Sequence, residues 1–178
     1  MTAVRAPDAR AVAAAAESLG RQLRPAVDQD WSVQAGDLIW TVRDVVDHLA
    51  DVCGFYSLHL GAQSPDRLRV DVRPHPAASN AERLAVAAAA TRLLTATIRA
   101  APPRATGWHF GGPADATGFA SLACNELLVH GWDIARGLGL PWETDDELCG
   151  RVLSRTFPAV PVSDIAWPAL ASANGRCP

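Results

Sequence analysis

The sequence has no surplus of positive charge, and all of its basic residues are arginine. Its 178 residues include 16 basic and 19 acidic side chains, which give a formal net charge of -3. Proteins that bind nucleic acid or anionic membrane surfaces usually carry a basic field. We therefore expect neither a nucleic-acid partner nor a membrane partner.

Cysteine is scarce, and long apolar runs are absent. The four cysteines are far apart and form no C-x-x-C pair: Cys53, Cys124, Cys149 and Cys177. This spacing argues against a disulfide framework and favours a reducing compartment. The first residues lack the apolar core of a signal peptide, and no apolar run reaches the ~18 residues that a membrane span needs. The sequence predicts a soluble cytoplasmic protein.

Segments with the period-two alternation of β-strands are nearly absent. Residues 68–73 alternate in this way, and Pro74 follows them. The composition is that of a globular protein, with 49% hydrophobic and 20% charged residues, and 178 residues are enough for one domain with a buried core. We predict an all-α fold and a single domain that covers residues 1–178.

Helix start signals organise the sequence. Three segments place a hydroxyl at a helix N-cap and an acid three residues later: Thr41 with Asp44, Ser79 with Glu82, and Thr144 with Glu147. Two further helices are predicted over residues 7–24, ended by Pro25, and over residues 117–136, ended by Gly137 and Gly139. The prediction is four long helices followed by one short C-terminal helix.

Two long connections bear on the arrangement of the helices. The linker between residues 60 and 79 could extend to about 60 Å at ~3.3 Å per residue, whereas a 20-residue helix is about 30 Å long. The second and third helices can therefore run parallel, in an up-down-down-up four-helix bundle. The second connection, residues 101–116, is rich in proline and glycine. A connection of this length is either a functional lid or a plain surface loop.

The segment 125–133 carries the strongest chemical signal. At about 100° per residue, Glu126 and His130 lie about 40° apart on the helical wheel, with Asp133 close to the same line. A carboxylate and an imidazole one turn apart can supply two ligands to zinc, iron or nickel from one rigid helix. The alternative for such a pair is an intrahelical hydrogen bond. A metal site needs a third ligand from elsewhere in the chain.

His48 is the candidate for the third ligand. It lies at the edge of the apolar stripe of the helix that follows Thr41, where a ligand beside a cleft would lie and where a hydrogen-bonded, partly buried histidine would lie too. His59 is about 16 Å further along this helix, too far to share a metal with His48. His75, between two prolines, is predicted to be solvated, and His109 is either a pocket donor or a surface residue.

Two motifs together carry a family resemblance. The segments 40–49, WTVRDVVDHL, and 125–135, NELLVHGWDIA, resemble the paired signature of the mycothiol-dependent maleylpyruvate isomerase-like branch of the DinB-like metalloproteins. The resemblance extends to the spacing between the motifs and to residues 167–176. It implies a DinB-like four-helix bundle in which His48, Glu126 and His130 hold one divalent metal. Zinc is the usual metal of the family, with nickel and iron as alternatives.

The resemblance also implies a chemistry. The isomerase proper has a second, C-terminal domain that contributes to its substrate site, whereas the sequence ends at Pro178, so maleylpyruvate isomerisation itself is not expected. What the resemblance implies is a metal that binds a small thiol such as mycothiol and presents the thiolate to a small electrophile. Such a thiol has a free pKa of about 8.5, and a divalent cation deprotonates it at neutral pH.

Two classes of function follow from these observations. The first is a metal-dependent enzyme for S-transfer to, or isomerisation of, a small electrophile. The second is a non-catalytic metal or small-molecule binding protein of the same fold, because fold alone does not decide function. A homodimer is compatible with either class.

Other residues in or next to the motifs are predicted to support the site or the core. Asp133 either accepts a hydrogen bond from a ligating imidazole or forms an ion pair with Arg136. Gly131 permits close packing or access to the site. Three residues are predicted to belong to the core and not to a reactive or cofactor-binding surface: Trp40, Trp132 and Cys124.

Overall fold

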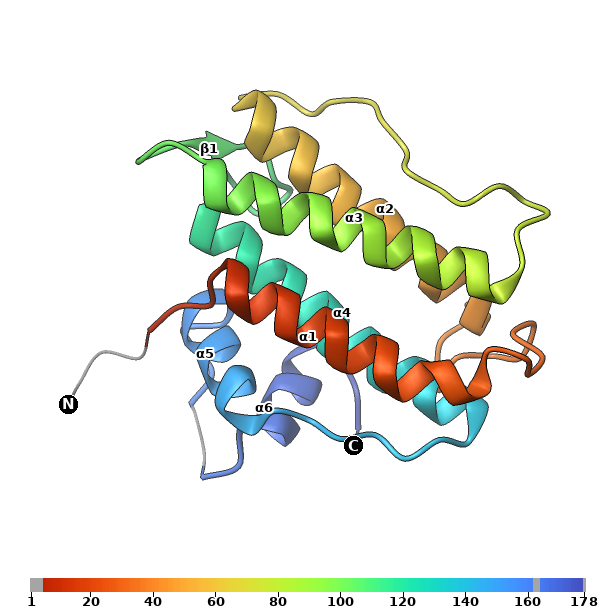
Figure 1. The fold of residues 1–178 in the computed structure, drawn as a ribbon. Helices are drawn as coiled ribbons and strands as arrows, with labels where there is room; N and C mark the ends of the chain where they lie inside the picture. Colours follow the sequence, from red (N-terminus) through yellow and green to blue (C-terminus); the bar gives the residue numbers. More distant parts are fainter. Residues whose placement is uncertain (1–4, 162–163, 178) are drawn as a thin grey trace.

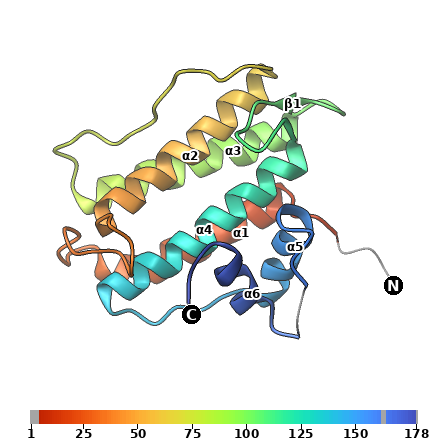
Figure 2. The ribbon, with the colours of Figure 1, turned by 180° about the vertical axis from the view of Figure 1, so that it is seen from behind.

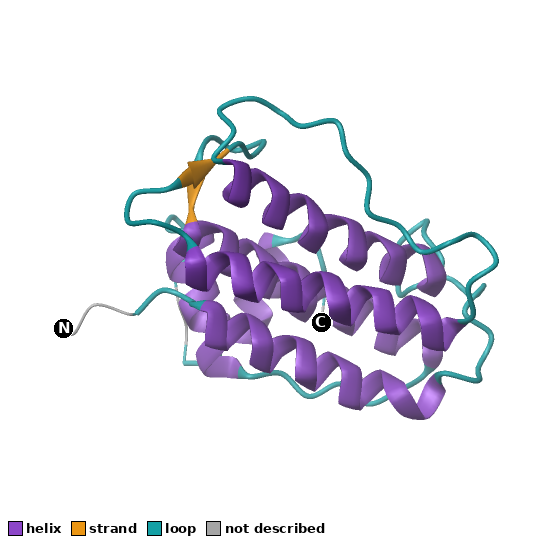
Figure 3. Ribbon diagram, turned by 45° about the horizontal axis from the view of Figure 1, so that its top comes forward, coloured by secondary structure: helices purple, strands orange, loops and turns teal. Residues whose placement is uncertain are grey.

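The computed structural model describes residues 5–161 and 164–177, and its regular structure is almost entirely helical (Figure 3). In chain order the elements are α1 (Ala9–Leu23), the 3-10 helix η1 (Arg24–Ala26), α2 (Val42–Ala62), α3 (Asn80–Ala100), β1 (Thr106–Gly107), β2 (Ala114–Asp115), α4 (Ala116–Leu138), α5 (Asp146–Thr156) and α6 (Ala166–Ala173). The prediction of an all-α fold is confirmed. Among the described residues, no helix is both long enough and apolar enough to cross a membrane.

Four long helices, α1 to α4, pack around the main core (Figure 1). Helix α2 contacts α3 and α4, and α1 contacts the same two helices. In Figure 1, α2 and α3 both run from right to left, whereas α1 and α4 run from left to right. Helix α5 packs on α4, and α6 packs on α5, as the view from behind shows (Figure 2). This arrangement places the two sequence motifs on neighbouring helices, α2 and α4.

The N-caps of α2 and α3 are those that the sequence predicts. The Thr41 hydroxyl accepts a hydrogen bond from the Asp44 backbone N–H, and the Asp44 carboxylate accepts one from the Thr41 N–H. Ser79 and Glu82 form the same reciprocal pair at the start of α3. Each pair satisfies two backbone donors that the first turn of a helix leaves free.

Two predicted boundaries need correction. Helix α5 is capped by Asp145, whose carboxylate accepts from the Leu148 N–H at 3.0 Å, and not by Thr144, so this prediction is wrong by one residue. Gly139 does end α4, with a left-handed φ of 66°, but Gly137 lies inside the helix. A Cβ atom at Gly137 would lie 2.4 Å from the carbonyl oxygen of Gln34. Gly137 is therefore needed for close packing and does not act as a helix stop.

The linker between α2 and α3 includes residues 68–73, which alternate like a strand in sequence but form no strand in the structure. Its backbone N–H groups bond to side chains of α2: Leu68 donates to Nε2 of His59 at 2.9 Å, and Val72 donates to Asp51 at 2.8 Å. The buried Arg83 of α3 holds the end of the linker through the carbonyl of Pro76. Polar side chains of the bundle thus replace the partner strand that alternation alone would require.

The sequence predicts one short helix after the bundle, whereas the structure has two. Helix α6 has no capping side chain at the residue before it. Its cap comes from Asp146 of α5, whose carboxylate accepts from the N–H groups of Ala166 at 2.8 Å and Trp167 at 2.9 Å. A cap supplied from twenty residues away is not visible in the residues next to the helix, which explains why the sequence pattern does not reveal this helix.

The connection of residues 101–116 contains the short hairpin β1–β2, whose backbone lies directly against α2. A Cβ atom at Gly107 would lie 2.4 Å from the carbonyl oxygen of His59. Beyond it, the Trp108 N–H donates to the carbonyl of Ser64 at 2.8 Å. The first strand is therefore anchored to the end of α2.

We predict that Gly107→Ala destabilises the protein by about 3 kcal/mol, because the backbone of α2 cannot move away from the new methyl group without disturbing the core. Denaturant unfolding followed by circular dichroism measures the change. Gly20→Ala in α1 is the matched control, because no atom lies within 4 Å of a Cβ there. The control should be neutral or stabilise by up to about 1 kcal/mol. Equal effects of the two substitutions would contradict the packing described here.

Candidate metal centre

Helices α2 and α4 bring together the three residues that the sequence motifs single out. Nε2 of His48 on α2 lies 3.0 Å from Oε2 of Glu126 on α4, and Nε2 of His130 lies 3.2 Å from the same oxygen. All three donor atoms lie within 4.8 Å of one another. Among the described residues, this is the one group of three or more histidine, cysteine or carboxylate side chains with such a spacing.

The donor set fits a divalent transition metal. Zinc binds histidine nitrogen and carboxylate oxygen at about 2.0–2.2 Å, so neighbouring ligand atoms lie roughly 3.3 Å apart in a tetrahedral site. The separations of 3.0 and 3.2 Å around Glu126 are close to that value. Three protein ligands leave at least one coordination position for a small molecule.

The cluster is partly buried, and each of its three side chains keeps some contact with solvent. The side chains of His48, Glu126 and His130 are 28%, 20% and 13% exposed, respectively. The ring of Trp40 lies beside them, with its centroid 5.2 Å from that of His48 and 6.3 Å from that of His130. Trp40 is 40% exposed, so the prediction that it belongs to the core is wrong. The loop before α2 holds its ring at the surface, next to the ligands.

Charge pairing within the cluster is strong. Burial acts against the ionised form of Glu126, but hydrogen bonds from His130 and His48 lower the pKa of Glu126 to about 2. Burial also acts against the protonated form of His130, yet hydrogen bonds to Asp133 and Glu126 raise the pKa of His130 to about 9. Without a metal at neutral pH, His130 is therefore an imidazolium between two carboxylates. A metal ion would take the place of its proton at Nε2.

Asp133 holds the other nitrogen of His130. Its Oδ2 atom lies 3.0 Å from Nδ1 of His130 and 2.7 Å from a guanidinium nitrogen of Arg176. The alternative partner considered from sequence, Arg136, instead forms an ion pair with Asp37 at 2.7 Å. Burial opposes ionisation of Asp133, but His130 and Arg176 together lower its pKa. The carboxylate is therefore charged and available to orient the imidazole.

This pairing predicts that the metal-free protein loses stability above neutral pH. The pKa of His130 rises from an ordinary 6.5 to about 9 in the folded protein, so its contribution is complete below pH 6.5 and is lost as the pH rises through 9. A tenfold change in proton affinity corresponds to about 1.4 kcal/mol, so the free energy of unfolding should fall by up to about 3 kcal/mol across this range. Denaturant unfolding at a series of pH values measures the slope.

His130→Gln is the variant that isolates this effect, because it removes the titrating group and keeps a polar side chain. Most of the decrease above pH 6.5 should disappear in the variant. The lowered pKa of Glu126 acts in the opposite sense, with stability present above pH 4.5 and lost as the pH falls towards 2. If the free energy of unfolding fell equally steeply above pH 6.5 in both proteins, the pairing of His130 with Asp133 and Glu126 would be contradicted.

A comparison with protein-family models identifies the group to which these features belong. The model of the mycothiol maleylpyruvate isomerase N-terminal domain matches residues 12–135. The chain belongs to this family. The matched region runs from α1 into α4 and includes His48, Glu126 and His130. Comparison with curated proteins and with solved structures gave no significant match.

The other histidines, His59, His75 and His109, do not belong to the cluster. His59 is fully buried; its Nε2 accepts from Leu68, so its Nδ1 carries the proton and donates to the carbonyl of Phe55 at 2.9 Å. His75 is exposed, in the linker. His109 is half-buried beside Tyr56, at 5.9 Å between ring centroids, and burial lowers its pKa. His59 thus has a structural role, whereas His109 lies in the loop between β1 and β2.

Three other residues in or next to the second motif, Cys124, Gly131 and Trp132, serve mainly in packing. Cys124 is fully buried, and burial raises the pKa of its thiol, which agrees with the prediction of a core residue. Trp132 is half-buried and lies against Trp167. A Cβ atom at Gly131 would lie 2.2 Å from the ring of Trp142. Gly131 therefore serves close packing and not access to the site.

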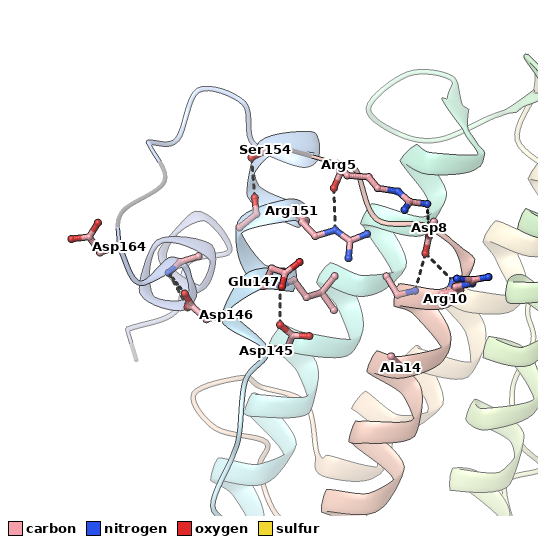
Figure 4. Close-up of a pocket in the computed structure, with 14 residues that line it drawn as sticks. Arg5, Asp8, Arg10, Ala14, Asp145, Asp146, Glu147, Arg151, Ser154 and Asp164 are labelled. Atoms are coloured by element: carbon pink, nitrogen blue, oxygen red, sulfur yellow. Dashed lines mark hydrogen bonds and ion pairs between the residues drawn. The ribbon is translucent and has the colours of Figure 1, made fainter. Parts of the chain in front are cut away.

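A groove of about 730 Å³ lies between α1 and α5, and several acidic side chains line it (Figure 4). None of the three candidate metal ligands lines this groove. Its carboxylates act mainly as helix caps. Asp8 accepts from the first N–H groups of α1, Asp145 accepts from the Leu148 N–H of α5, and Asp146 accepts from Ala166 at the start of α6. These three acidic residues of the groove are thus explained by the N-terminal ends of α1, α5 and α6, which they cap.

Arg176 is the residue near the site that sequence reasoning missed. It lies forty-three residues after Asp133 and outside the region that the family model matches. No periodicity or spacing connects an arginine beyond α6 with a carboxylate inside α4. The resemblance of residues 167–176 to the family was the single available signal.

Proposed function

We propose that this protein is a metal-dependent enzyme that uses a small, mycothiol-like thiol for S-transfer to, or isomerisation of, a small electrophile. The observation that carries the proposal is the His48, Glu126 and His130 cluster, whose donor atoms lie within 4.8 Å of one another between α2 and α4. Membership of the mycothiol maleylpyruvate isomerase N-terminal domain family supports the choice of thiol. In this proposal α1 to α4 form the up-down-down-up bundle of DinB-like proteins, and zinc is the expected metal, with nickel and iron as alternatives.

The residues of the chain have distinct roles in this proposal. His48, Glu126 and His130 hold the metal, and Asp133 fixes the ring of His130 through Nδ1 so that Nε2 faces Glu126. When bound, a divalent metal lowers the pKa of a coordinated thiol and so supplies a nucleophilic thiolate at neutral pH. The exposed face of Trp40 offers an apolar wall beside the ligands, against which a planar electrophile can pack.

The S-transfer step balances without a further reagent. With an alkyl or aryl halide as a test electrophile, the thiol releases its proton to solvent, sulfur forms a bond to carbon, and halide leaves with the electron pair of the broken bond. In the isomerisation branch, sulfur adds to a conjugated double bond and leaves again after rotation about the resulting single bond. The thiol is consumed in the first branch and regenerated in the second.

A non-catalytic metal-binding or small-molecule binding protein is the second candidate. The observation that favours it is the mutual pairing of the cluster: Glu126 accepts from both histidines, and His130 also bonds to Asp133, so these side chains are satisfied without a metal. A site of this kind can persist in a fold after catalysis is lost.

Consumption of an electrophile distinguishes the two candidates. Protein loaded with zinc is mixed with mycothiol and a chromogenic aryl halide, and the release of halide is compared with that of the metal-free protein and of free zinc at equal concentration. The enzyme proposal predicts a rate that depends on both metal and thiol. One bound metal per chain with no increase in rate, across several electrophiles and thiols, would favour the binding protein.

A further inference from the structure

The segment of residues 174–176, which follows α6, lies on α4 next to the candidate metal ligands. Asn174 bonds to Asn125, the residue before Glu126, and Arg176 bonds to Asp133, three residues after His130. The two contacts flank the stretch of α4 that carries both ligands. We call residues 174–176 the post-α6 segment.

The contact between Asn174 and Asn125 is reciprocal. The Nδ2 atom of each side chain donates to the Oδ1 atom of the other at 2.9 Å, and Asn125 is 7% exposed. Gly175 then turns the chain with a left-handed φ of 74°, a conformation that suits glycine. The Arg176 N–H donates to the carbonyl of Ala171 at 2.9 Å. The post-α6 segment is thus held by both backbone and side-chain bonds.

Arg176 donates hydrogen bonds to both oxygens of the Asp133 carboxylate. One guanidinium nitrogen donates to Oδ2 at 2.7 Å, and Nε donates to Oδ1 at 3.3 Å. Asp133 is 1% exposed, so in the intact protein Arg176 and His130 take the place of solvent at this carboxylate. A planar guanidinium that engages both oxygens fixes the plane of the carboxylate as well as its position.

We infer that Arg176 is a positioning residue of the metal centre, and that the post-α6 segment controls how tightly the protein holds its metal. Asp133 accepts the Nδ1 proton of His130, so that Nε2, once a metal displaces its own proton, would direct its lone pair to the side of Glu126. Without Arg176, the buried carboxylate loses its second partner and its fixed orientation. The inference rests on the proposed metal site, but it concerns a residue beyond the segment matched by the family model.

The coupling must act in both directions. If the docked post-α6 segment strengthens metal binding, then bound metal strengthens the docking of the segment by the same factor. The backbone N–H of Arg176, bonded to Ala171, reports on this docking. Zinc should therefore slow hydrogen exchange of the peptide that contains Arg176 in the unmodified protein.

The first test is the zinc dissociation constant, measured by chelator competition for the full chain and for Arg176→Met. Arg176→Met should weaken zinc binding by about 10- to 100-fold, the usual effect of removing a group that orients a metal ligand. Arg176→Lys should recover part of the loss, and added guanidinium ion at millimolar concentration should partly restore binding in Arg176→Ala. Arg136→Met is the matched control, because Arg136 lies on α4 near Asp133 in sequence but pairs with Asp37. This variant should bind zinc as the wild type does.

The outcomes separate this inference from the proposed function. Wild-type protein that binds no metal would overturn both. Wild-type protein that binds one zinc per chain, with equal affinity in Arg176→Met and no effect of zinc on exchange near Arg176, would overturn the positioning role alone. Should Arg176→Met not fold, hydrogen exchange in the wild-type protein decides, because zinc-independent exchange of the post-α6 segment contradicts the coupling.

Discussion

His130→Ala will not retain the metal, yet its helical bundle will remain folded. His130 contributes one of three donor atoms, and it alone connects the cluster to Asp133 and Arg176. Groups that merely support a metal ligand are worth about 10- to 100-fold in affinity, so the loss of a ligand should exceed about 100-fold. Metal analysis after dialysis, together with circular dichroism, measures occupancy and fold. We expect about one metal per chain in the wild type and close to none in the variant.

His75→Ala is the matched control for this experiment. His75 is an exposed histidine of the linker and is absent from the cluster, so its loss should leave metal content unchanged. The bundle should stay folded in both variants, because a chain of 178 residues can bury an adequate core without a metal. Full occupancy in His130→Ala would show that the metal, if any, is held elsewhere.

Glu126→Gln is expected to abolish thiol-dependent turnover. The substitution keeps the shape of the side chain but removes the charge that both histidines share, at 3.0 and 3.2 Å. A neutral amide is a weaker ligand than a carboxylate, and the substitution removes the one carboxylate that lies between His48 and His130. The rate of electrophile consumption should fall by more than about 100-fold, to the level of the metal-free protein.

Glu17→Gln provides the comparison, because Glu17 is an exposed glutamate on α1 and is not part of the cluster. Its rate should equal that of the wild type. If Glu126→Gln retains both metal and rate, then Glu126 is not a ligand, and the assignment of the cluster as the reactive site fails.

The parts of this structure that the sequence predicts are those fixed by residues close together in the chain. Thr41 and Ser79 form capping boxes with acids three residues later, and these contacts depend on a few consecutive residues. Glu126 and His130 share a face because of helical periodicity alone. The position of His48 at the edge of an apolar stripe suits a hydrogen-bonded histidine as well as a ligand, so periodicity does not decide its role and the family resemblance alone favours the metal.

Apart from the cap of α5, the features that the sequence does not predict depend on contacts between distant parts of the chain. Asp146 caps α6 from another helix, Arg176 reaches Asp133 across forty-three residues, and the linker at Val72 bonds to Asp51 instead of to a strand. Such partners are fixed by tertiary packing, which leaves no trace in local periodicity. The exposure of Trp40 is not predicted for a similar reason, because it depends on how the loop before α2 meets α4.

The absorption spectrum of cobalt-substituted protein during titration with mycothiol is the most direct test of the central claim. A thiol that binds as thiolate at the His48, Glu126 and His130 site should produce a sulfur-to-cobalt charge-transfer band in the near ultraviolet, which saturates at one thiol per chain and is absent from Glu126→Gln. A cobalt spectrum that does not change on addition of mycothiol or other small thiols would contradict the thiol-dependent function proposed for this metal centre.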